Sequence, residues 1–382
     1  MLKDKKQNFM KLQILQENFS KALNIACRLT ISKIQLPILT NVLLKTSKNK
    51  LLVVSTNLEM SVSIPIGAKV EKEGEITIPA RTITELISNL TPGPINLSAE
   101  KEILKISAAN FESSISGINA AEFPVVPHDV GTQNIKISSE NFLDALNTVL
   151  FAVSTDETRP VLTGVLVIIR KNELLMVATD GFRLSQKKIK IEGFKEEKKV
   201  IIPKNALSEI LRLGPESGTI DFSFKEKENQ VIFAVSDTVL ATRVIDGDFP
   251  DYERIIPKTS RLKVSLDREE FLRAIKLASV FAKEAANVVK LNAGGRYLEV
   301  SAESSQSGSQ ITKVDAKSQG LSDSDTFLIA FNFRFLEDFL NATSTEEVAI
   351  EFSDPNAPAL FIDTSDKEYL HVIMPVRLQG SE

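Results

Sequence analysis

The feature of this sequence that most constrains its fold is a pair of phrases that recur along the chain. The phrase NFSKAL at residues 18–23 returns as NFLDAL at 141–146 and, more faintly, as EFLRAI at 270–275. The phrase LPILTNVLL at 36–44 returns as RPVLTGVL at 159–166. The step from Phe19 to Phe142 is 123 residues, and the step from Phe142 to Phe271 is 129. Solenoid repeats are only about 20–50 residues long, so a repeat of this size predicts three similar domains in tandem.

Each repeat begins with a segment that we expect to be a helix. Its apolar residues recur at i, i+4 and i+7, which places them on one buried face. They are Phe19, Leu23 and Ala26, then Phe142, Leu146 and Val149, then Phe271, Ile275 and Ala278. Residues 138–139 and 265–267 contain Ser and Asp, which predicts N-caps for the second and third of these helices.

The rest of each repeat alternates short strands with polar turns. We expect β-hairpins from residues 42–44 with 51–54 and from 165–169 with 174–177, and a further hairpin turn at Gly294-Gly295. A second helix is expected at residues 82–90, 205–213 and 332–340, and closing strands at 95–99, 103–108 and 111–118. Strands outnumber helices, which indicates an α+β class. Two Phe-Pro segments, 122–132 and 248–260, are expected to link the domains, and the polar segment 301–309 to form a loop.

The composition limits the class of protein and the cellular environment to expect. The net charge of −4 argues against a protein that binds nucleic acid with its whole surface. Cys27 is the single cysteine, so no intrachain disulfide can form and a reducing cytoplasm is expected. Its place on the apolar helix face indicates a core residue. No apolar run approaches the roughly 18 residues that span a bilayer, and the N-terminus lacks a secretory pattern.

A search for catalytic chemistry finds little. The two histidines, His128 and His371, are isolated, so no zinc site follows from their spacing. The S-x-x-K match at residues 47–50 falls at a hairpin tip, and no phosphate-binding glycine loop is present. Asp180-Gly181 and Asp246-Gly247 could contact a metal or phosphate, although strand-ending turns are the favoured interpretation. We therefore expect no metal, no cofactor and no catalytic residue.

Basic residues recur on the predicted helices. A recurring set on equivalent helices would line one common surface and attract the phosphate backbone without reading sequence. The middle repeat weakens the pattern, since residues 141–154 hold no basic residue and Asp144 is acidic. The candidates for facing DNA are Lys21, Arg28, Lys33, Arg81, Lys204, Arg212, Arg273, Lys276, Lys283 and Arg334.

Four motifs then identify a family. They are LPIL at residues 36–39, ATDGFRL at 178–184, DGDFPDY at 246–252 and MPVRL at 374–378. With them the chain resembles the bacterial sliding clamps, the β subunits of DNA polymerase III, over residues 10–378. The resemblance implies three clamp domains at residues 10–129, 130–257 and 258–378, with an extension at 1–9 and a tail at 379–382. It also implies a head-to-tail ring of two chains, with helices lining the hole and sheets outside.

The same resemblance implies the function and its sites. A ring would encircle duplex DNA, slide on it without sequence preference and tether the replicative polymerase as a processivity factor. Polymerase subunits, the clamp loader and repair proteins would bind a pocket between the second and third domains through short peptide motifs. The matching pocket residues are Arg159, Val161, Leu162, Thr179, Gly181, Phe182, Arg183, Leu184, Pro250, Arg254, Ile255, Val372, Met374, Pro375, Val376 and Arg377. The matching ring-interface residues are Ser113, Ile115, Ile118, Val280 and Phe281.

The sequence differs from the family pattern at two pocket positions, and two alternative functions remain open. Val161 stands where the family often has an aromatic residue, and Phe182 where it often has a polar ring, so the pocket would select somewhat different peptides. One rival is a multi-domain adaptor that binds proteins without encircling DNA. The other is a hydrolase with an unrecognised site around Asp180 or Asp246.

Overall fold

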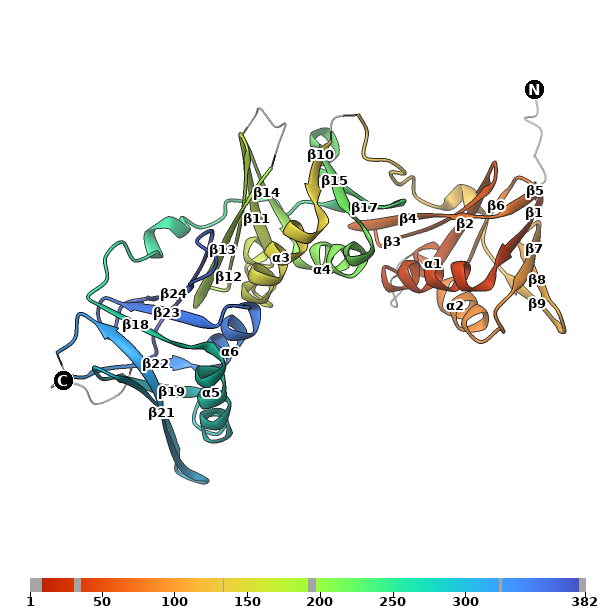
Figure 1. Cartoon of the computed structure of the whole chain (residues 1–382). Coiled ribbons are helices and arrows are strands. Elements are labelled where there is room, and N and C mark those ends of the chain that lie inside the picture. Colours follow the sequence, from red (N-terminus) through yellow and green to blue (C-terminus); the bar gives the residue numbers. More distant parts are fainter. Residues whose placement is uncertain (1–8, 31–35, 133, 192–196, 323–324, 378–382) are drawn as a thin grey trace. The chain divides into compact units, whose positions relative to one another are not determined.

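The computed structural model describes residues 9–30, 36–132, 134–191, 197–322 and 325–377 (Figure 1). Within these residues the chain forms two compact units, which we describe separately. Unit 1 contains the first domain together with residues 134–139 and 212–244 of the second. Unit 2 contains residues 140–211 of the second domain and all of the third.

The order of elements repeats three times, as the sequence predicts. The first domain contains β1 (Phe9–Leu15), α1 (Gln16–Arg28), η1 (Pro37–Thr40), β2 (Asn41–Ser47), β3 (Lys50–Thr56), β4 (Met60–Gly67), β5 (Lys69–Lys72), β6 (Glu75–Pro79), α2 (Ala80–Ser88), β7 (Pro94–Glu100), β8 (Ile103–Ala108) and β9 (Phe111–Ser116). The second contains β10 (Ile135–Ser138), α3 (Ser139–Val149), η4 (Pro160–Leu162), β11 (Gly164–Arg170), β12 (Glu173–Thr179), β13 (Arg183–Lys190), β14 (Lys198–Pro203), α4 (Lys204–Leu213), β15 (Thr219–Lys225), β16 (Gln230–Val235) and β17 (Thr238–Arg243). The second domain ends with η7 (Tyr252–Ile255), and the third contains β18 (Leu262–Asp267), α5 (Arg268–Ala282), β19 (Val288–Ala293), β20 (Tyr297–Ser304), β21 (Gly308–Gln319), β22 (Phe327–Asn332), α6 (Phe333–Ala342), β23 (Glu347–Phe352), β24 (Ala359–Asp363) and β25 (Tyr369–Ile373).

The strands form three antiparallel sheets in the described residues. Unit 1 holds a sheet in the order β5-β1-β7-β8-β9 and another in the order β10-β15-β16-β17-β4-β3-β2-β6. Unit 2 holds the sheet β14-β11-β12-β13-β25-β24-β23-β18-β21-β20-β19-β22. Consecutive domains therefore share sheets: β17 of the second domain pairs with β4 of the first, and β25 of the third pairs with β13 of the second.

The predicted helix faces form the cores. Phe19, Phe142 and Phe271 are each no more than 2% exposed, and the other members of the three apolar stripes are also buried. The helices α1 and α2 lie together on one side of the first-domain strands, and α5 and α6 pack together in the third domain (Figure 1). Asp267 caps α5 by accepting a hydrogen bond from the backbone N–H of Glu270 at 2.8 Å, which confirms the predicted cap.

One predicted loop is wrong. Residues 301–309 are mostly strand, because β20 runs to Ser304 and β21 begins at Gly308. Alternating burial explains the error: Ala302 and Ser304 point into the structure while their neighbours face solvent, so a polar run still forms a hairpin. The extension was also expected to reach residue 9, but Phe9 already pairs with Glu100 in β1. Residues 1–8 and the tail at 379–382 lie outside the described residues.

Cys27 is half-buried at the edge of the first-domain core, against which it packs. None of the helices in the described parts of the chain is long and apolar enough to cross a membrane.

Candidate protein-binding and DNA-facing surfaces

The turn between β12 and β13 is held by its own side chains. Thr179 donates from Oγ1 to the carbonyl of Arg183 at 2.6 Å and accepts the N–H of Gly181 at 3.1 Å. Asp180 accepts the N–H groups of Phe182 and Arg183 at 2.9 and 3.1 Å. Gly181 adopts φ +92°, a conformation that favours glycine. The prediction that Asp180-Gly181 forms a turn at the end of a strand is confirmed. The turn leaves the aromatic side chain of Phe182 64% exposed.

An apolar cluster lies beside this turn in unit 2. Leu184 of β13 pairs with Val372 of β25, and both side chains are fully buried. Partly buried side chains pack against this cluster from separate segments: Val161 from η4, Phe249 from the linker and Leu360 from β24. The fold thus brings together residues from five separate segments, of which only Leu184 and Phe249 lie in the family motifs.

The predicted pocket residues differ in exposure. Exposed residues are Arg159, Gly181, Phe182, Pro250, Arg254, Ile255 and Arg377; half-buried residues are Val161, Met374, Pro375 and Val376; buried residues are Leu162, Thr179, Leu184 and Val372. Two backbone bonds hold the C-terminal segment in place, from Met374 N–H to the carbonyl of Phe182 and from Val376 N–H to that of Ala330, both at 2.8 Å. The surface therefore has a buried apolar base and a rim of exposed aromatic and cationic groups.

Arg183 requires a correction. The resemblance placed it among the peptide contacts, but its side chain is only 10% exposed. Its Nε donates to Asp180 at 3.0 Å, one Nη to Asp338 at 2.5 Å and the other to the carbonyl of Phe151 at 2.7 Å. The guanidinium also lies 4.5 Å from the ring centre of Phe335. Arg183 therefore positions the turn and joins the second domain to α6, and its guanidinium is bonded within the protein.

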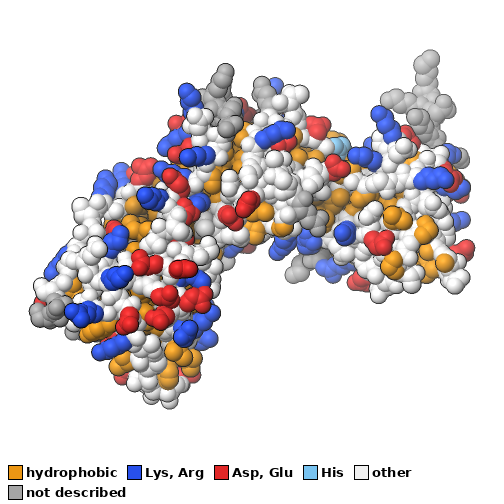
Figure 2. All heavy atoms as spheres, viewed as in Figure 1, with side chains coloured by type: hydrophobic (Ala, Val, Ile, Leu, Met, Phe, Trp, Pro, Cys, Tyr) orange, Lys and Arg blue, Asp and Glu red, His pale blue; other side chains and the backbone are white. Residues whose placement is uncertain are grey.

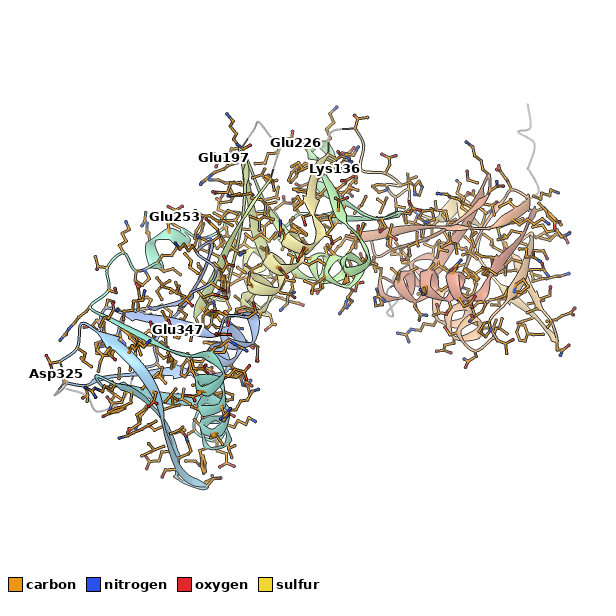
Figure 3. The ribbon with its side chains drawn as sticks, in the orientation of Figure 1. Lys136, Glu197, Glu226, Glu253, Asp325 and Glu347 are labelled. Atoms are coloured by element: carbon orange, nitrogen blue, oxygen red, sulfur yellow. The ribbon has the colours of Figure 1, made fainter. Side chains whose placement is uncertain are left out.

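Sequence reasoning missed part of the apolar cluster. Tyr252 in η7 is 8% exposed and Phe249 packs beside it, with ring centres 6.4 Å apart. Burial and the neighbouring carboxylate of Glu253, labelled in Figure 3, raise the pKa of Tyr252. The Phe-Pro motif was the available signal: it was interpreted as a linker and as a family motif, but only its Pro250 was assigned to the pocket. Leu360 carried no signal, because its contact depends on the pairing of β24 with β25.

The two histidines have structural partners. His371 is fully buried, its Nδ1 lies 2.7 Å from Oγ of Ser185, and its ring stacks on Phe339 at 5.5 Å. Burial, and then the charge of Arg183, lower the pKa of His371 well below 6.5. His128 lies 3.0 Å from Oγ of Ser63. Among the residues that the structure describes, no cluster of His, Cys, Asp or Glu is arranged to hold a metal ion.

Most candidate DNA-facing side chains are exposed on helices. Exposed ones are Lys21 and Arg28 on α1, Arg81 on α2, Arg212 on α4, Arg273 and Lys276 on α5, Lys283 at its end and Arg334 on α6. Lys204 is half-buried, and burial, with the charge of Arg183, lowers its pKa. Lys33 lies outside the described residues. Basic and acidic side chains intermix on the face shown in Figure 2.

The middle of unit 2 is acidic at its helices. A hollow of about 650 Å³ is lined by residues of α3, α6 and the turn after β24. Its charged groups are Asp144, Asp338, Asp363, Asp366 and Lys187, and Lys187 pairs with Asp366. Carboxylates therefore outnumber cations in the lining of this hollow.

The predicted interface residues fall into two groups. Val280 is 61% exposed near the end of α5, and Ser113 lies on β9, the edge strand of its sheet. Ile115 is only 7% exposed and packs in the first-domain core, and Ile118 exchanges backbone hydrogen bonds with Thr77. Phe281 packs partly against the third-domain core. Of this set, Val280 and the edge of β9 are the parts open to a partner.

A second strand edge was not anticipated. Residues 308–315 of β21 pair with β20 on one side, while only residues 316–319 pair with β18 on the other. Ile311 in this free stretch is 65% exposed. An exposed strand edge of this kind is a template for pairing with another chain.

Comparison with known proteins agrees with this architecture. Family models of the DNA polymerase III β subunit match residues 10–127 (N-terminal domain), 136–251 (central domain) and 253–377 (C-terminal domain). The beta sliding clamp of Staphylococcus aureus is 31% identical over 379 residues, covering 96% of this chain and 99% of that protein. The sliding clamp of Bacillus subtilis superposes with a TM-score of 0.91 at 27% identity, covering 97% of this chain and 99% of that one. That of C. crescentus gives 0.91 at 29% identity, with coverage of 97% and 100%. The chain, with its three clamp domains, belongs to the family of DNA polymerase III β subunits, the bacterial sliding clamps.

Proposed function

We propose that this chain is a non-catalytic processivity factor that closes with a second copy into a ring around duplex DNA. The observation that carries the proposal is how the domains join. The last strand of the second domain, β17, pairs with β4, the fourth strand of the first domain. In the same way β25, the last strand of the third domain, pairs with β13 of the second. If every last strand pairs with the equivalent strand of a neighbouring domain, β9 and the outer edge of β21 are left to pair with each other. In a ring of two copies, β9 of each copy pairs with β21 of the other.

The repeat also predicts the register of that joint. In each domain we follow the strand pairing, strand by strand, starting from the residue that precedes the second helix. By this path Gln310 of β21 is the position equivalent to Ser185 of β13. Counting back from the equivalent bridges at Ile118 and Ile245, Ser113 stands where Leu240 stands in β17. Because Leu240 faces the residue equivalent to Ser185, Gln310 is expected to face Ser113 of the partner subunit. Val280, near the end of α5, would lie beside this joint, as part of a head-to-tail contact that closes on itself.

Enclosure explains the modest charge of the chain. A ring retains DNA by topology, so weak and sequence-independent attraction is enough and also permits sliding. Exposed cations on α1, α2, α4, α5 and α6 support this role, and the net charge of −4 argues against tight binding by the whole surface. We propose that these helices face the DNA and that the protein works in the cytoplasm.

We further propose that the apolar cluster of unit 2 receives short peptide motifs from polymerase subunits, the clamp loader and repair proteins. Phe182, Val161 and Met374 would contact apolar side chains, with Arg159 and Arg377 toward acidic or polar flanks. Burying two or three apolar side chains contributes roughly 1.5–3 kcal/mol each. After ordering costs, affinities near the micromolar range, about 8 kcal/mol, allow partners to exchange. For the whole chain we propose domains at residues 10–129, 130–257 and 258–378.

Loading on closed DNA tests the ring directly. The labelled protein is loaded by a clamp loader onto nicked circular DNA, and the complex is isolated by gel filtration. Linearising the DNA should release the protein, whereas a mock-treated circle should retain it. Retention on linear DNA, or no retention on the circle, would contradict encirclement and favour the adaptor alternative.

A further inference from the structure

The turn between β3 and β4 in unit 1 repeats the turn at the proposed peptide site. Thr56 donates from Oγ1 to the carbonyl of Met60 at 3.0 Å and accepts the N–H of Leu58 at 3.0 Å. Asn57 accepts the N–H groups of Glu59 and Met60 at 3.1 and 2.7 Å. These four bonds are the bonds that Thr179 and Asp180 make in unit 2. The two turns are therefore built by the same side-chain contacts, 123 residues apart.

The surroundings of the two turns also correspond. Arg243 donates its N–H to the carbonyl of Glu59 at 2.8 Å, just as Met374 donates to Phe182. An apolar cluster is assembled from the same parts, with η1 in place of η4 and the first Phe-Pro linker in place of the second. It contains Ile38, Leu39, Leu43, Val54, Ala120, Phe123 and Val126. Unit 1 thus has the apolar base that unit 2 offers to peptides.

Leu58 differs from its counterpart in unit 2, and its backbone conformation is unfavourable for leucine. It occupies the place of Gly181 and keeps its left-handed backbone, with φ +74°. A leucine in this conformation is strained; the hydrogen bonds of Thr56 and Asn57 hold the turn in place, and strain of this kind clusters at functional sites. Burial does not offset the strain, since the side chain is 49% exposed. The position thus presents a large apolar group where a glycine would fold more easily.

The rim around Leu58 carries different charges from the unit 2 site: an exposed Arg243 stands in the place of Met374, and the two arginines of the unit 2 rim are replaced. Leu36, 51% exposed, stands in the place of Arg159, which in unit 2 lies beside the glycine of the turn. His128 stands in the place of Arg254, counted from the Phe-Pro pair. Burial of part of the ring, and then the charge of Lys45, lower the pKa of His128, so the ring is uncharged at neutral pH. Glu59 replaces the neutral Phe182.

From these observations we infer a second docking site, in unit 1, centred on Leu58 with Leu36 and Glu59 at its rim. Its ligand is a short apolar peptide segment of a partner protein that carries a basic residue beside a large apolar one. The leucines would cover the apolar side chain, and the carboxylate of Glu59 would face the basic residue. The inference rests on the proposed function in one respect, since it takes the equivalent turn of unit 2 as a peptide site.

Two peptides separate the sites. The basic probe is Lys-Gln-Leu-Leu-Leu-Phe-Lys, and the acidic probe has Asp at both ends; both carry fluorescein and are titrated against the full-length protein by anisotropy. Leu58→Gly is the test variant, because it introduces the residue that unit 2 uses at this place and so preserves the turn. Leu58→Asn is a second variant, since asparagine also tolerates the left-handed conformation. Leu328→Ala, which truncates a leucine of similar exposure (44%) in β22, is the matched control.

Both Leu58 variants should keep or raise the melting temperature, because they relieve the backbone strain, and should bind the basic probe about tenfold more weakly, because one apolar contact is lost. Their affinity for the acidic probe should be unchanged, and Leu328→Ala should behave as the unmodified protein. Equal affinity of both Leu58 variants and the unmodified protein for the basic probe, or no binding of that probe at all, would overturn the inference. If Phe182→Ala leaves the acidic probe unaffected while Leu58→Gly weakens the basic one, the proposed unit 2 site fails and the unit 1 site stands.

Discussion

Arg183 in β13 donates from Nη1 to Oδ2 of Asp338 in α6 across 2.5 Å, and this contact joins the second domain to the third. Arg183 is 10% exposed and Asp338 is 41% exposed, so the pair is partly shielded from water. Because the same guanidinium also holds Asp180 in the β12–β13 turn, the shape of the proposed peptide site depends on how the two domains are joined.

Removing the partner of this arginine should cost stability. Asp338→Ala leaves a partly buried cation with one fewer acceptor, so the free energy of unfolding of unit 2 should fall by about 1–2 kcal/mol. Urea denaturation followed by circular dichroism measures the change. Glu337→Ala, the adjacent position in α6, is the control and should change stability by less than about 0.5 kcal/mol. Equal stability of the two variants would show that the contact contributes nothing.

Binding of peptides should respond differently to Met374→Ala and Arg183→Ala. Met374→Ala removes a half-buried apolar contact and should weaken binding about tenfold without loss of stability. Arg183→Ala should also weaken binding, but by releasing the turn, and therefore with a lower melting temperature. Calorimetric titration of the acidic probe and thermal unfolding are measured on both variants. Unchanged affinity in Met374→Ala would count against the pocket assignment, and dimer formation should persist in both.

The predicted register of the ring joint can be tested by cross-linking. Facing residues of an antiparallel pair have Cα atoms about 4.5–5.5 Å apart, within the range that a disulfide spans. In a Cys27→Ser background, the pair Gln310→Cys and Ser113→Cys should form a covalent dimer on mild oxidation, seen by non-reducing electrophoresis. Ser309→Cys with Ser113→Cys shifts the register by one residue and should link poorly. Comparable yields from the two pairs would contradict the register.

Charge at the end of α5 should open the ring. Val280 is 61% exposed, so Val280→Asp is tolerated in a single chain but opposes burial of this position in a joint. Sedimentation velocity at low protein concentration should show a 42.2 kDa species in place of a dimer. Phe281→Asp is a poorer test, because Phe281 packs partly against the core and its loss would also destabilise the domain. A stable Val280→Asp dimer would refute this part of the interface.

Stability should fall in mild acid because of His371. Burial lowers its pKa in the folded state well below the ordinary 6.5, so between the two values the unfolded chain binds the extra proton. The free energy of unfolding is therefore not reduced by this group above about pH 6.5, and it declines as the pH falls below that value. Urea unfolding at pH 7.5 and 5.5 measures the decline, and His371→Asn should reduce it. His128→Gln is the comparison at the exposed histidine, where a smaller effect is expected; an identical pH dependence in His371→Asn would contradict the assignment.

Much of the fold was predictable from the chain alone, because its signals are local. The helix stripes beginning at Phe19, Phe142 and Phe271 and the hairpin at residues 47–50 depend on periodicity and turn chemistry, which act within a few residues. The repeat then placed the same elements in each domain. The hairpin through Ser304 and Gly308 was mistaken for a loop, because its strands bury few apolar side chains and composition carries no trace of the pairing.

By itself, the sequence determined the number of domains, the order of their elements and the residues that mark the family, because repetition and apolar spacing are written along the chain. Only the tertiary structure decided what those residues do in space. It turned Arg183 inward to Asp338 and Phe151, buried Ile115, freed the edge of β21 and left Leu58 strained and exposed. These outcomes depend on which strands meet across more than a hundred residues, and contacts at that range leave no local pattern from which to infer them.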